Sequence, residues 1–410
     1  MSLLYDIFIA FYTLFIRFAA LFNDKARSWV SGRKGWKEEL LSFSGEGKIA
    51  WFHAASLGEF EQGRPVMEAF RQKYPGYRIL LTFFSPSGYQ QRKDYKGADK
   101  VMYLPPDCRR NARHFVGAVK PDVAIFIKYE FWYNYLYELK KNSIPVIFIS
   151  VLFRRHQPFF KWYGGWFRKR LRTADHFFVQ DQVSLDLVSD LGITQASISG
   201  DTRFDRVADI LNNKTENIAV EAFCKGQKTL LAGSTWPPDE VLLKELLSAY
   251  PQMKMIIAPH EVKAERIRQL IESLGSQAAR YTMDKPEDWL KKQVLIIDTI
   301  GVLSSIYRYA DIAYIGGAFG SGLHNIQEPA VNGMPVIFGP SYHKFREAVD
   351  LVKMGGAFSI RTSAGLNEVV GALLNDQEKY QRACGISKKY MFDNTGATAR
   401  IMEGLAQFCQ

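Results

Sequence analysis

Short apolar runs separated by longer amphipathic segments are the main pattern along the chain. In the first half the apolar runs are continuous, which is typical of strands buried on both faces of a parallel sheet. We predict strands at 49–54, 79–84, 100–104, 123–127, 146–150, 176–180 and 197–200. Helical segments lie between several of them, for example at 61–73 and 181–191. This alternation predicts a doubly wound α/β sheet.

The same alternation begins again after a polar stretch at about 206–228, which predicts a helix and a linker. Further strands are predicted at 229–234, 253–260, 294–299, 312–317 and 335–339, and helices at 240–250, 264–274 and 303–309. A chain of 410 residues is too long for one ordinary core. We therefore predict an α/β protein with two Rossmann-like domains that face a cleft, residues 23–210 and 211–390, and a C-terminal helix, 391–410, that packs back across the cleft.

The first 22 residues form a mostly apolar segment in which only Asp6 and Arg17 are charged. As a helix with a rise of about 1.5 Å per residue, this segment is just long enough to span a bilayer core. Its polar positions share one helical face and its phenylalanines cover much of the rest, which favours a helix lying in the membrane interface. A buried helix of a soluble domain is the alternative. Basic residues at 25–37 predict that the rest of the chain lies on the cytoplasmic side.

A formal net charge of +11 favours anionic partners. The segment 153–172 interleaves arginines and lysines with aromatic residues. It reads either as an ordinary amphipathic helix with a solvated face or as a surface that meets anionic lipid. Single-stranded nucleic acid also suits this mixture, but does not explain the apolar N-terminal segment. We therefore predict an anionic membrane surface as a partner, and no nucleic acid.

A carboxylate, Glu59, follows the first predicted strand in the stretch 53–60. Open α/β sheets bind ligands outside the carboxyl ends of their strands, and a carboxylate there can take a proton from a hydroxyl. However, Ser56-x-x-Glu59 is also a capping box, in which the Glu side chain accepts from the Ser56 amide. The pattern alone does not choose between a base and a cap.

Two further charged residues follow predicted strands. Glu130 comes after 123–127 and is expected at the same sheet edge as Glu59, whereas Arg203 comes after 197–200 and is suited to neutralise a phosphate or to pair with Asp205. In the second half, a glycine-rich stretch at 316–322 leads into a probable helix, whose first amides can hold a phosphate. The stretch matches neither a Walker A loop nor a dinucleotide fingerprint.

The cysteines and histidines give no metal pattern. The four cysteines lie far apart, and no pair of histidines has the spacing of metal ligands. We therefore predict no metal and interpret His53, His260, His324 and His343, all near predicted strand ends, as hydrogen-bonding residues.

Together these motifs resemble the Kdo transferases, a family that moves 3-deoxy-manno-octulosonic acid (Kdo) from CMP-Kdo to a lipid A precursor. The matching motifs occur in the same order from residue 1 to about 390: the N-terminal helix, 53–59, Thr82 with 85–88, 103–107, 130–132, 144–146, 200–205, 298–301, 316–317, 324–329 and 335–340. The resemblance implies a GT-B glycosyltransferase fold, a metal-independent enzyme without a cofactor, and a place at the inner membrane in lipopolysaccharide biosynthesis.

The resemblance also implies residue roles. Glu59 would be the general base, and Glu130 and Arg203 would stabilise the transition state. The donor would be bound by Pro259, His260, Ile300, Gly301, Val302, Asn325, Ile326, Gln327 and Glu328. Family members often carry Lys where this chain has Arg203, and a Gly-Glu pair where it has Gly301-Val302. The stretch 150–155 also lacks the family's usual pattern, so contacts to the acceptor cannot be carried over.

Two other functions stay open at this point. One is another GT-B enzyme, such as a UDP-sugar transferase or epimerase. The other is a non-catalytic adaptor that binds anionic lipid at the membrane surface. Glu59 and Glu130 at one sheet edge argue against the adaptor.

Overall fold

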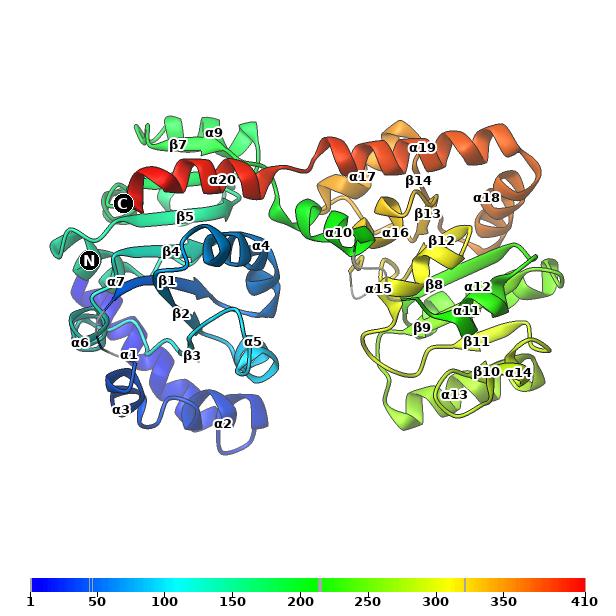
Figure 1. The fold of residues 1–410 in the computed structure, drawn as a ribbon, viewed down its shortest axis with the longest axis horizontal. Helices are drawn as coiled ribbons and strands as arrows, with labels where there is room; N and C mark the ends of the chain where they lie inside the picture. Colours follow the sequence, from blue (N-terminus) through cyan, green and yellow to red (C-terminus); the bar gives the residue numbers. More distant parts are fainter. Residues whose placement is uncertain (1, 44, 46, 213–215, 321, 410) are drawn as a thin grey trace. The chain divides into compact units, whose positions relative to one another are not determined.

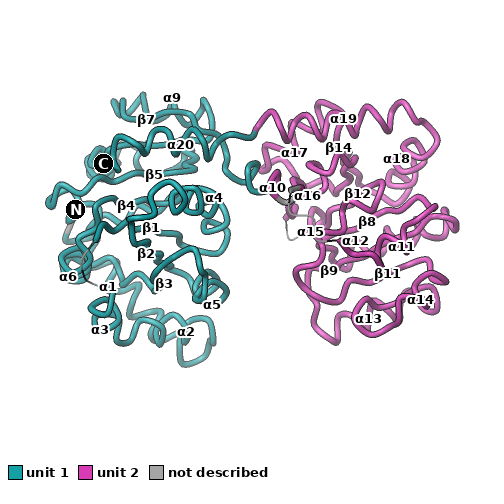
Figure 2. The backbone as a smooth tube through the Cα atoms, viewed as in Figure 1, with its two compact units in different colours: residues 1–206, 395–410 teal, residues 207–394 magenta. Residues whose placement is uncertain are grey.

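The protein divides into two compact units (Figure 2), in a computed structural model that describes residues 2–43, 45, 47–212, 216–320 and 322–409. Unit 1 comprises residues 1–206 and 395–410, and unit 2 comprises residues 207–394. The chain therefore leaves unit 1 once and returns to it at its C-terminal end.

Unit 1 is built on one parallel sheet (Figure 1). Its strands are β1 (Lys48–Ala54), β2 (Tyr77–Phe83), β3 (Lys100–Tyr103), β4 (Val123–Ile127), β5 (Val146–Val151), β6 (His176–Val179) and β7 (Ala196–Ile198). They lie in the order β3-β2-β1-β4-β5-β6-β7. Every residue of β4 and β5 is buried, because both faces of these strands are covered. The order of connection changes direction between β1 and β4, which are neighbours in the sheet.

Helices cover both faces of this sheet. They are α1 (Ser2–Ala19), α2 (Asp24–Ser31), α3 (Trp36–Leu41), α4 (Leu57–Lys73), α5 (Pro86–Arg92), α6 (Arg109–Val119), α7 (Tyr133–Lys141), η1 (Pro158–Phe160), α8 (Gly165–Leu171), α9 (Gln182–Ser189), α20 (Ala397–Leu405) and η4 (Ala406–Phe408). Side chains alternate along β1, so that Trp51 packs in the core on one face and Phe52 in the core on the other.

The C-terminal helix α20 belongs to unit 1. Asp205 accepts hydrogen bonds from the amides of Gly396 (2.5 Å) and Thr398 (2.6 Å), which fix the start of the helix. Ile401 and Leu405 are fully buried in one of the two cores of unit 1. The structure divides the predicted helix at 391–410 between two helices. Its first residues end the helix 377–393 in unit 2, and the remainder contains α20 in unit 1.

Unit 2 is a second parallel α/β sheet. Its strands are β8 (Thr229–Thr235), β9 (Lys254–Pro259), β10 (Ala278–Arg280), β11 (Val294–Ile296), β12 (Ile312–Ile315), β13 (Val336–Phe338) and β14 (Ala357–Ser359). They lie in the order β10-β11-β9-β8-β12-β13-β14. The helix α10 (Thr202–Asn212) leads into this unit, whose helices are α11 (Ile218–Cys224), α12 (Pro237–Ala249), α13 (Ala264–Leu274), η2 (Gly275–Gln277), α14 (Pro286–Trp289), α15 (Leu303–Ile306), η3 (Tyr307–Tyr309), α16 (Gln327–Val331), α17 (Arg346–Met354), α18 (Ser363–Asn375) and α19 (Gln377–Asp393).

The predicted class of fold, two Rossmann-like α/β domains, is confirmed by these two sheets. The strands β10 and β14 were not predicted. Each has three residues and lies at the edge of its sheet, so neither carries the long apolar run that marks a central strand.

Candidate functional site

Glu59 and Glu130 follow adjacent strands of unit 1. Glu59 lies in the first turn of α4, after β1, and Glu130 lies just after β4. Because β1 pairs with β4 where the order of connection changes direction, both carboxylates lie at the topological switch point of the sheet. This is the position at which open α/β sheets bind their ligands. The structure thus brings together two of the three predicted catalytic residues at one sheet edge.

A buried hydrogen-bond network holds the region around Glu130. His53, at the end of β1, is fully buried, and its Nε2 accepts a hydrogen bond from the indole of Trp132 at 2.9 Å. Its Nδ1 lies 2.8 Å from the hydroxyl of Thr82, which also accepts from the indole of Trp51. Since Nε2 accepts, Nδ1 must carry the proton, so the network selects one neutral tautomer of His53.

The same ring lies beside the second carboxylate. One oxygen of Glu130 is 3.5 Å from His53 Nε2, and the Glu130 side chain is 13% exposed. A neutral His53 whose Nε2 already accepts from Trp132 cannot donate to Glu130. The carboxylate therefore receives no hydrogen bond from this ring.

The contacts of Glu59 decide against the predicted capping box. Ser56 is the N-cap residue of α4, but its side chain makes no capping hydrogen bond to the helix amides. Instead, the Ser56 hydroxyl donates to the Glu59 carboxylate. Glu59 is half-buried and is positioned by a hydroxyl, so it does not serve as the reciprocal cap that the sequence pattern indicates.

Arg203 is held by the neighbouring carboxylate of Asp201. Its Nε and Nη2 both donate to one oxygen of Asp201, at 2.8 and 2.6 Å, and its amide donates to the other oxygen at 2.9 Å. Burial alone would raise the pKa of Asp201, but the charge and hydrogen bonds of Arg203 hold that pKa below its ordinary value. Asp205 accepts from the first amides of α20.

Lys128 is a charged residue of this site that the sequence reasoning missed. It follows the last residue of β4 and has a φ of +66°, a conformation that residues other than glycine rarely adopt. Burial lowers its pKa, whereas the neighbouring charge of Glu59 raises it and that of Arg203 lowers it. Lys128 therefore lies within electrostatic range of both predicted catalytic residues. Its position directly after a fully apolar strand is the feature of the sequence that could have indicated a site residue.

Three rings are stacked at the carboxyl edge of the sheet in unit 2. Trp236 follows β8, His260 follows β9, and His324 lies in the loop after β12. Their ring centroids are 4.9 Å apart for Trp236 and His260 and 4.3 Å apart for the two histidines. The Trp236 indole also donates to His324 Nε2 at 3.0 Å. Burial, and then the charge of His260, lowers the pKa of His324, so this ring is neutral near pH 7.

A buried carboxylate organises the loop that carries His324. Asp239 is fully buried and accepts from the amide of Trp236 (2.9 Å), the hydroxyl of Tyr314 (2.8 Å) and the amide of Gly317 (3.0 Å). Gly317 has a φ of +94°, and a Cβ at Gly316 would lie 2.4 Å from a backbone oxygen. These two glycines allow the loop to approach β8 closely.

The helix whose first amides were predicted to hold a phosphate, α16, is short. The helix α16 has five residues, and its first amide, that of Gln327, already donates to the side chain of Asn325. Asn325 also donates to Glu328 at 3.1 Å. The Gln327 side chain is 1% exposed, and its Nε2 has no hydrogen-bond partner. The side-chain amide of Gln327 is thus a buried donor without a partner in this loop.

The other predicted donor-binding residues lie on two neighbouring loops. Pro259 is buried at the end of β9, directly before His260. Ile300 is 84% exposed in the loop after β11, Gly301 has a φ of +93°, and Val302 is the N-cap residue of α15. Since β11 is the neighbour of β9, both loops lie at the edge that carries the ring stack. Ile326, by contrast, is buried.

Comparison with known proteins gives a consistent picture. A family model described as 3-deoxy-D-manno-octulosonic-acid transferase (kdotransferase) matches residues 31–206. A protein named 3-deoxy-D-manno-octulosonic acid transferase from Chlamydophila psittaci is 26% identical, over 95% of this chain and 92% of its own. The protein of that name from Haemophilus influenzae is 28% identical, over 88% and 87%. This chain is similar to the Kdo transferases over most of its length.

Solved structures extend the comparison to the fold. A UDP-GlcNAc 2-epimerase from Neisseria meningitidis superposes with a TM-score of 0.62 and 16% identity, over 88% of this chain and all of that one. Two domains, each built on a parallel α/β sheet, thus resemble the folds of GT-B transferases and epimerases. The match with the Kdo transferase model covers Glu59, Glu130 and Arg203, which all lie in unit 1.

The N-terminal helix α1 presents a broad apolar surface. Exposed fractions reach 69% for Phe15 and 78% for Phe22, just beyond α1, and the exposed apolar residues are Leu3, Leu4, Ile7, Phe8, Phe11, Tyr12, Leu14, Phe15, Phe18, Leu21 and Phe22. Within the described residues, no helix has the length and apolar character needed to cross a bilayer. The segment 153–172 joins α1 on this side of unit 1, because Trp166 of α8 packs against Tyr5.

Proposed function

We propose that the protein transfers Kdo from CMP-Kdo to a hydroxyl of a lipid A precursor in lipopolysaccharide biosynthesis. The observation that carries this proposal is the pair of carboxylates, Glu59 and Glu130, at the switch point of unit 1, in a chain whose relatives are named Kdo transferases. The donor and the acceptor are taken from that family resemblance.

The proposed chemistry is a direct displacement at the anomeric carbon of Kdo. Glu59 takes the proton of the acceptor hydroxyl while the acceptor oxygen forms its bond to that carbon. The bond between the carbon and the CMP phosphate breaks, and CMP leaves with the electron pair. Ser56 supports this role, because its hydroxyl orients the Glu59 carboxylate without a capping bond to the helix.

Glu130 and Arg203 balance the charges of this step. Positive charge that develops at the anomeric carbon is stabilised by Glu130, which the neutral His53 leaves unpaired. Arg203, oriented by Asp201, faces the negative charge of the donor. Lys128 adds a second cation beside Glu59, which suits the carboxylate of Kdo.

Unit 2 holds the CMP group in this proposal. The stacked rings of Trp236, His260 and His324 offer an aromatic surface at the carboxyl edge of its sheet. The unsatisfied Nε2 of Gln327 provides a donor for an oxygen of the nucleotide. We propose no metal ion and no cofactor for these contacts.

We further propose that α1 lies in the cytoplasmic surface of the inner membrane, where the lipid acceptor is found. The exposed phenylalanines and leucines of α1 support this, because a patch of this size on a protein surface usually marks an interaction site. An interfacial helix buries such a face at the level of the lipid headgroups.

The test of the catalytic proposal is Glu59→Gln, which keeps an acceptor for Ser56 but removes the base. We expect sugar transfer to fall by about 10²- to 10⁴-fold with an unchanged melting temperature. Glu68→Gln, on the same helix, is the matched control and should transfer at the wild-type rate. Near-normal transfer by the Glu59 variant would refute the role.

Calorimetry with CMP and UDP separates the proposal from the alternative of a UDP-sugar enzyme. We expect CMP to bind unit 2 more tightly than UDP. A preference for UDP would overturn the assigned donor. CMP release upon mixing CMP-Kdo with the lipid acceptor, followed by mass spectrometry of the product, excludes the adaptor.

A further inference from the structure

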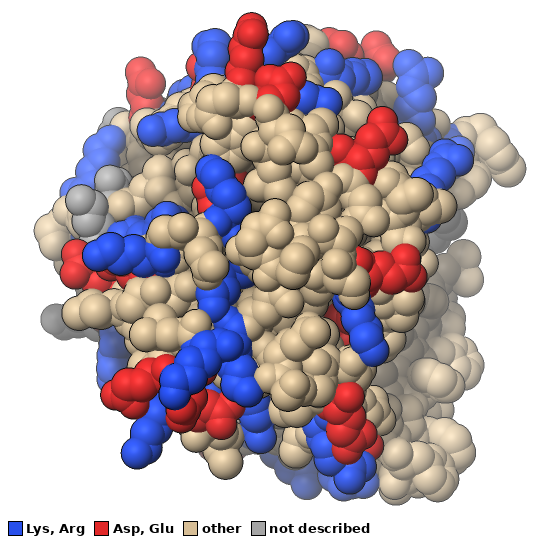
Figure 3. All heavy atoms as spheres, turned by 90° about the vertical axis from the view of Figure 1, so that its right-hand side faces the viewer, with Lys and Arg blue, Asp and Glu red and all other residues tan. Residues whose placement is uncertain are grey.

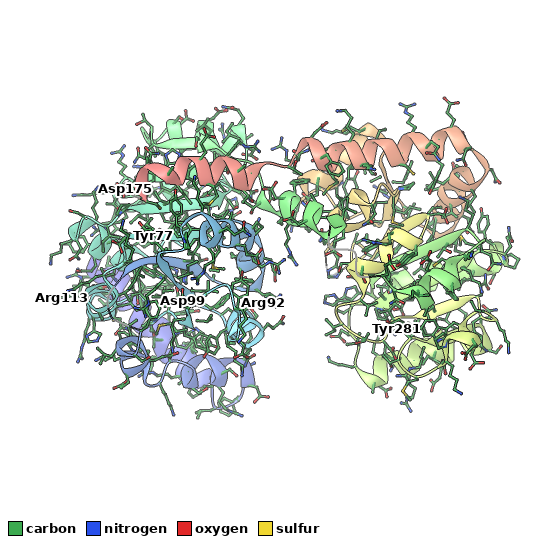
Figure 4. The ribbon with its side chains drawn as sticks, viewed as in Figure 1. Tyr77, Arg92, Asp99, Arg113, Asp175 and Tyr281 are labelled. Carbon is green, nitrogen blue, oxygen red and sulfur yellow. The ribbon has the colours of Figure 1, made fainter. Side chains whose placement is uncertain are left out.

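A basic hollow lies on the outer side of α6 and α7 in unit 1. It has a volume of about 760 Å³, and its charged and polar lining consists of Arg109, Arg110, Arg113, His114, Glu138 and Lys141. Figure 4 labels Arg113 on α6, at the margin of the unit. The one carboxylate in this set, Glu138, is only 8% exposed, so the exposed lining is cationic.

Most of these cations have no ion-pair partner among the residues that the structure describes. Arg109 pairs with Asp6 of α1 at 2.8 Å. Arg110, Arg113 and Lys141 are exposed and make no ion pair with any residue that the structure describes. The hollow therefore presents positive charge that the protein itself does not neutralise.

The arrangement of these arginines disfavours α6 as a helix. Arg109 and Arg110 occupy its first turn, which contains no acidic residue, although the N-terminal end of a helix favours negative charge. Arg113 lies four residues after Arg109 and three after Arg110, a spacing at which like charges repel on one helical face. The cluster therefore costs the helix some stability, and a bound anion would offset this cost.

The hollow adjoins the apolar surface of α1. A second hollow of about 270 Å³ shares Arg109 and Glu138 with the first and adds Arg170 of α8. A third, of about 780 Å³, is lined by Arg17 of α1 together with Lys34. Basic side chains thus lie along the length of α1, next to its exposed leucines and phenylalanines.

We propose that the hollow of Arg110, Arg113 and Lys141 binds the phosphate of an anionic phospholipid headgroup. This inference rests on the membrane position of α1 in the proposed function. When the apolar face of α1 lies among acyl chains, cations beside it reach the level of the phosphates, with long side chains that extend toward the headgroups. Binding then has an apolar part, supplied by α1, and a separable part that depends on lipid charge.

The test is the triple variant Arg110→Gln, Arg113→Gln and Lys141→Gln, assayed by flotation with vesicles. Wild-type protein should bind vesicles that contain phosphatidylglycerol at least about tenfold more tightly than vesicles of phosphatidylcholine alone. The triple variant should lose most of this preference and keep its binding to neutral vesicles. Its melting temperature should stay unchanged or rise, because the repulsion within α6 is removed.

The matched control removes the same number and kind of charges from unit 2, with Lys353→Gln, Arg361→Gln and Arg382→Gln. All three residues are exposed. If this control loses the lipid preference as strongly as the first variant, overall charge and not the hollow is responsible, and the inference is wrong. Tight calorimetric binding of inorganic phosphate, abolished by the first variant, would instead assign the hollow to a soluble anion.

The outcomes also separate this inference from the proposed function. The triple variant should transfer sugar normally to an acceptor dispersed in detergent, whereas Glu59→Gln should not. Equal wild-type binding to neutral and anionic vesicles would refute the headgroup site alone. No binding of the wild type to either vesicle would refute the membrane role of α1 as well.

Discussion

The two units share an architecture but differ sharply in charge. Each has seven parallel strands covered by helices. Of the 53 Lys and Arg residues of the chain, 21 lie in unit 2 beside 21 of the 42 Asp and Glu residues, so unit 2 has no formal net charge. The whole charge of +11 therefore lies in unit 1. Figure 3 shows the mixed acidic and basic surface on the side of unit 2.

This difference indicates a division of labour. The unit with the excess of positive charge also carries the exposed apolar helix α1 and the two site carboxylates. The neutral unit carries a stack of rings and a buried carboxylate that shapes a glycine-rich loop. The same type of sheet can thus serve the two tasks proposed above, membrane binding with catalysis in unit 1 and CMP binding in unit 2. Only the loops and the outer helix surfaces have to differ. Variants that act on one unit alone test how far the two tasks are separate.

The largest effect should come from Asp239→Ala in unit 2. Loss of the carboxylate leaves three donors, two of them amides, without an acceptor in a fully buried place. We expect unit 2 to lose about 3 kcal/mol or more of unfolding free energy. Urea unfolding followed by circular dichroism measures it. Asp393→Ala, which removes a solvent-exposed pair with Lys389, should change it by less than about 0.5 kcal/mol.

A smaller effect in unit 1 should follow from Trp132→Phe. This change removes the donor to His53 Nε2 and leaves a buried acceptor unpaired, which costs about 1–2 kcal/mol. We expect kcat of sugar transfer to fall about tenfold, because the loop that carries Glu130 loosens. Trp162→Phe is the control, since Trp162 is 93% exposed. A normal kcat for Trp132→Phe would show that the network does not position Glu130.

The matching change in unit 2 is Trp236→Phe. It keeps a ring against His260 but removes the hydrogen bond to His324. We expect CMP affinity, measured by calorimetry, to weaken about three- to tenfold while vesicle binding stays unchanged, in line with the loss of one hydrogen bond. If vesicle binding falls instead, CMP binding and membrane binding are not divided between the two units.

The smallest effect concerns pH and unit 1 alone. Burial raises the pKa of Asp107 to about 7, although Tyr5 and two amides donate to it. A carboxyl group with a raised pKa stabilises the fold when protonated, so this contribution is lost as the pH rises through about 7. The melting temperature should fall by a few degrees from pH 6 to pH 8, relative to Asp107→Asn. Parallel curves for the two proteins would contradict this.

The sequence allowed the central strands of both sheets to be predicted because they are continuous apolar runs. The edge strands β10 and β14 were missed since three residues carry too little pattern. Glu59 and Glu130 were expected at one edge, and the pairing of β1 with β4 places them there. The hydrogen bond of Ser56 was not predicted, because the same spacing permits either a capping bond or a contact between side chains.

Other parts of the site depend on contacts between distant segments. The stack of Trp236, His260 and His324 joins three loops that the sequence separates, so no local pattern indicates it. Asp201 binds Arg203, and Asp205 caps the start of α20, far along the chain. Periodicity shows which elements form, whereas tertiary contacts decide which polar groups meet.

The return of α20 to unit 1 has a consequence for synthesis on the ribosome. Unit 2 is an insertion between two segments of unit 1, and the later segment supplies Ile401 and Leu405 to a core of unit 1. Unit 2 has all of its residues once position 394 has been translated, while unit 1 waits for the last residues of the chain. Unit 1 therefore completes its folding last. A nascent chain that stops within unit 2 leaves that core open, with apolar surface exposed to proteases and chaperones.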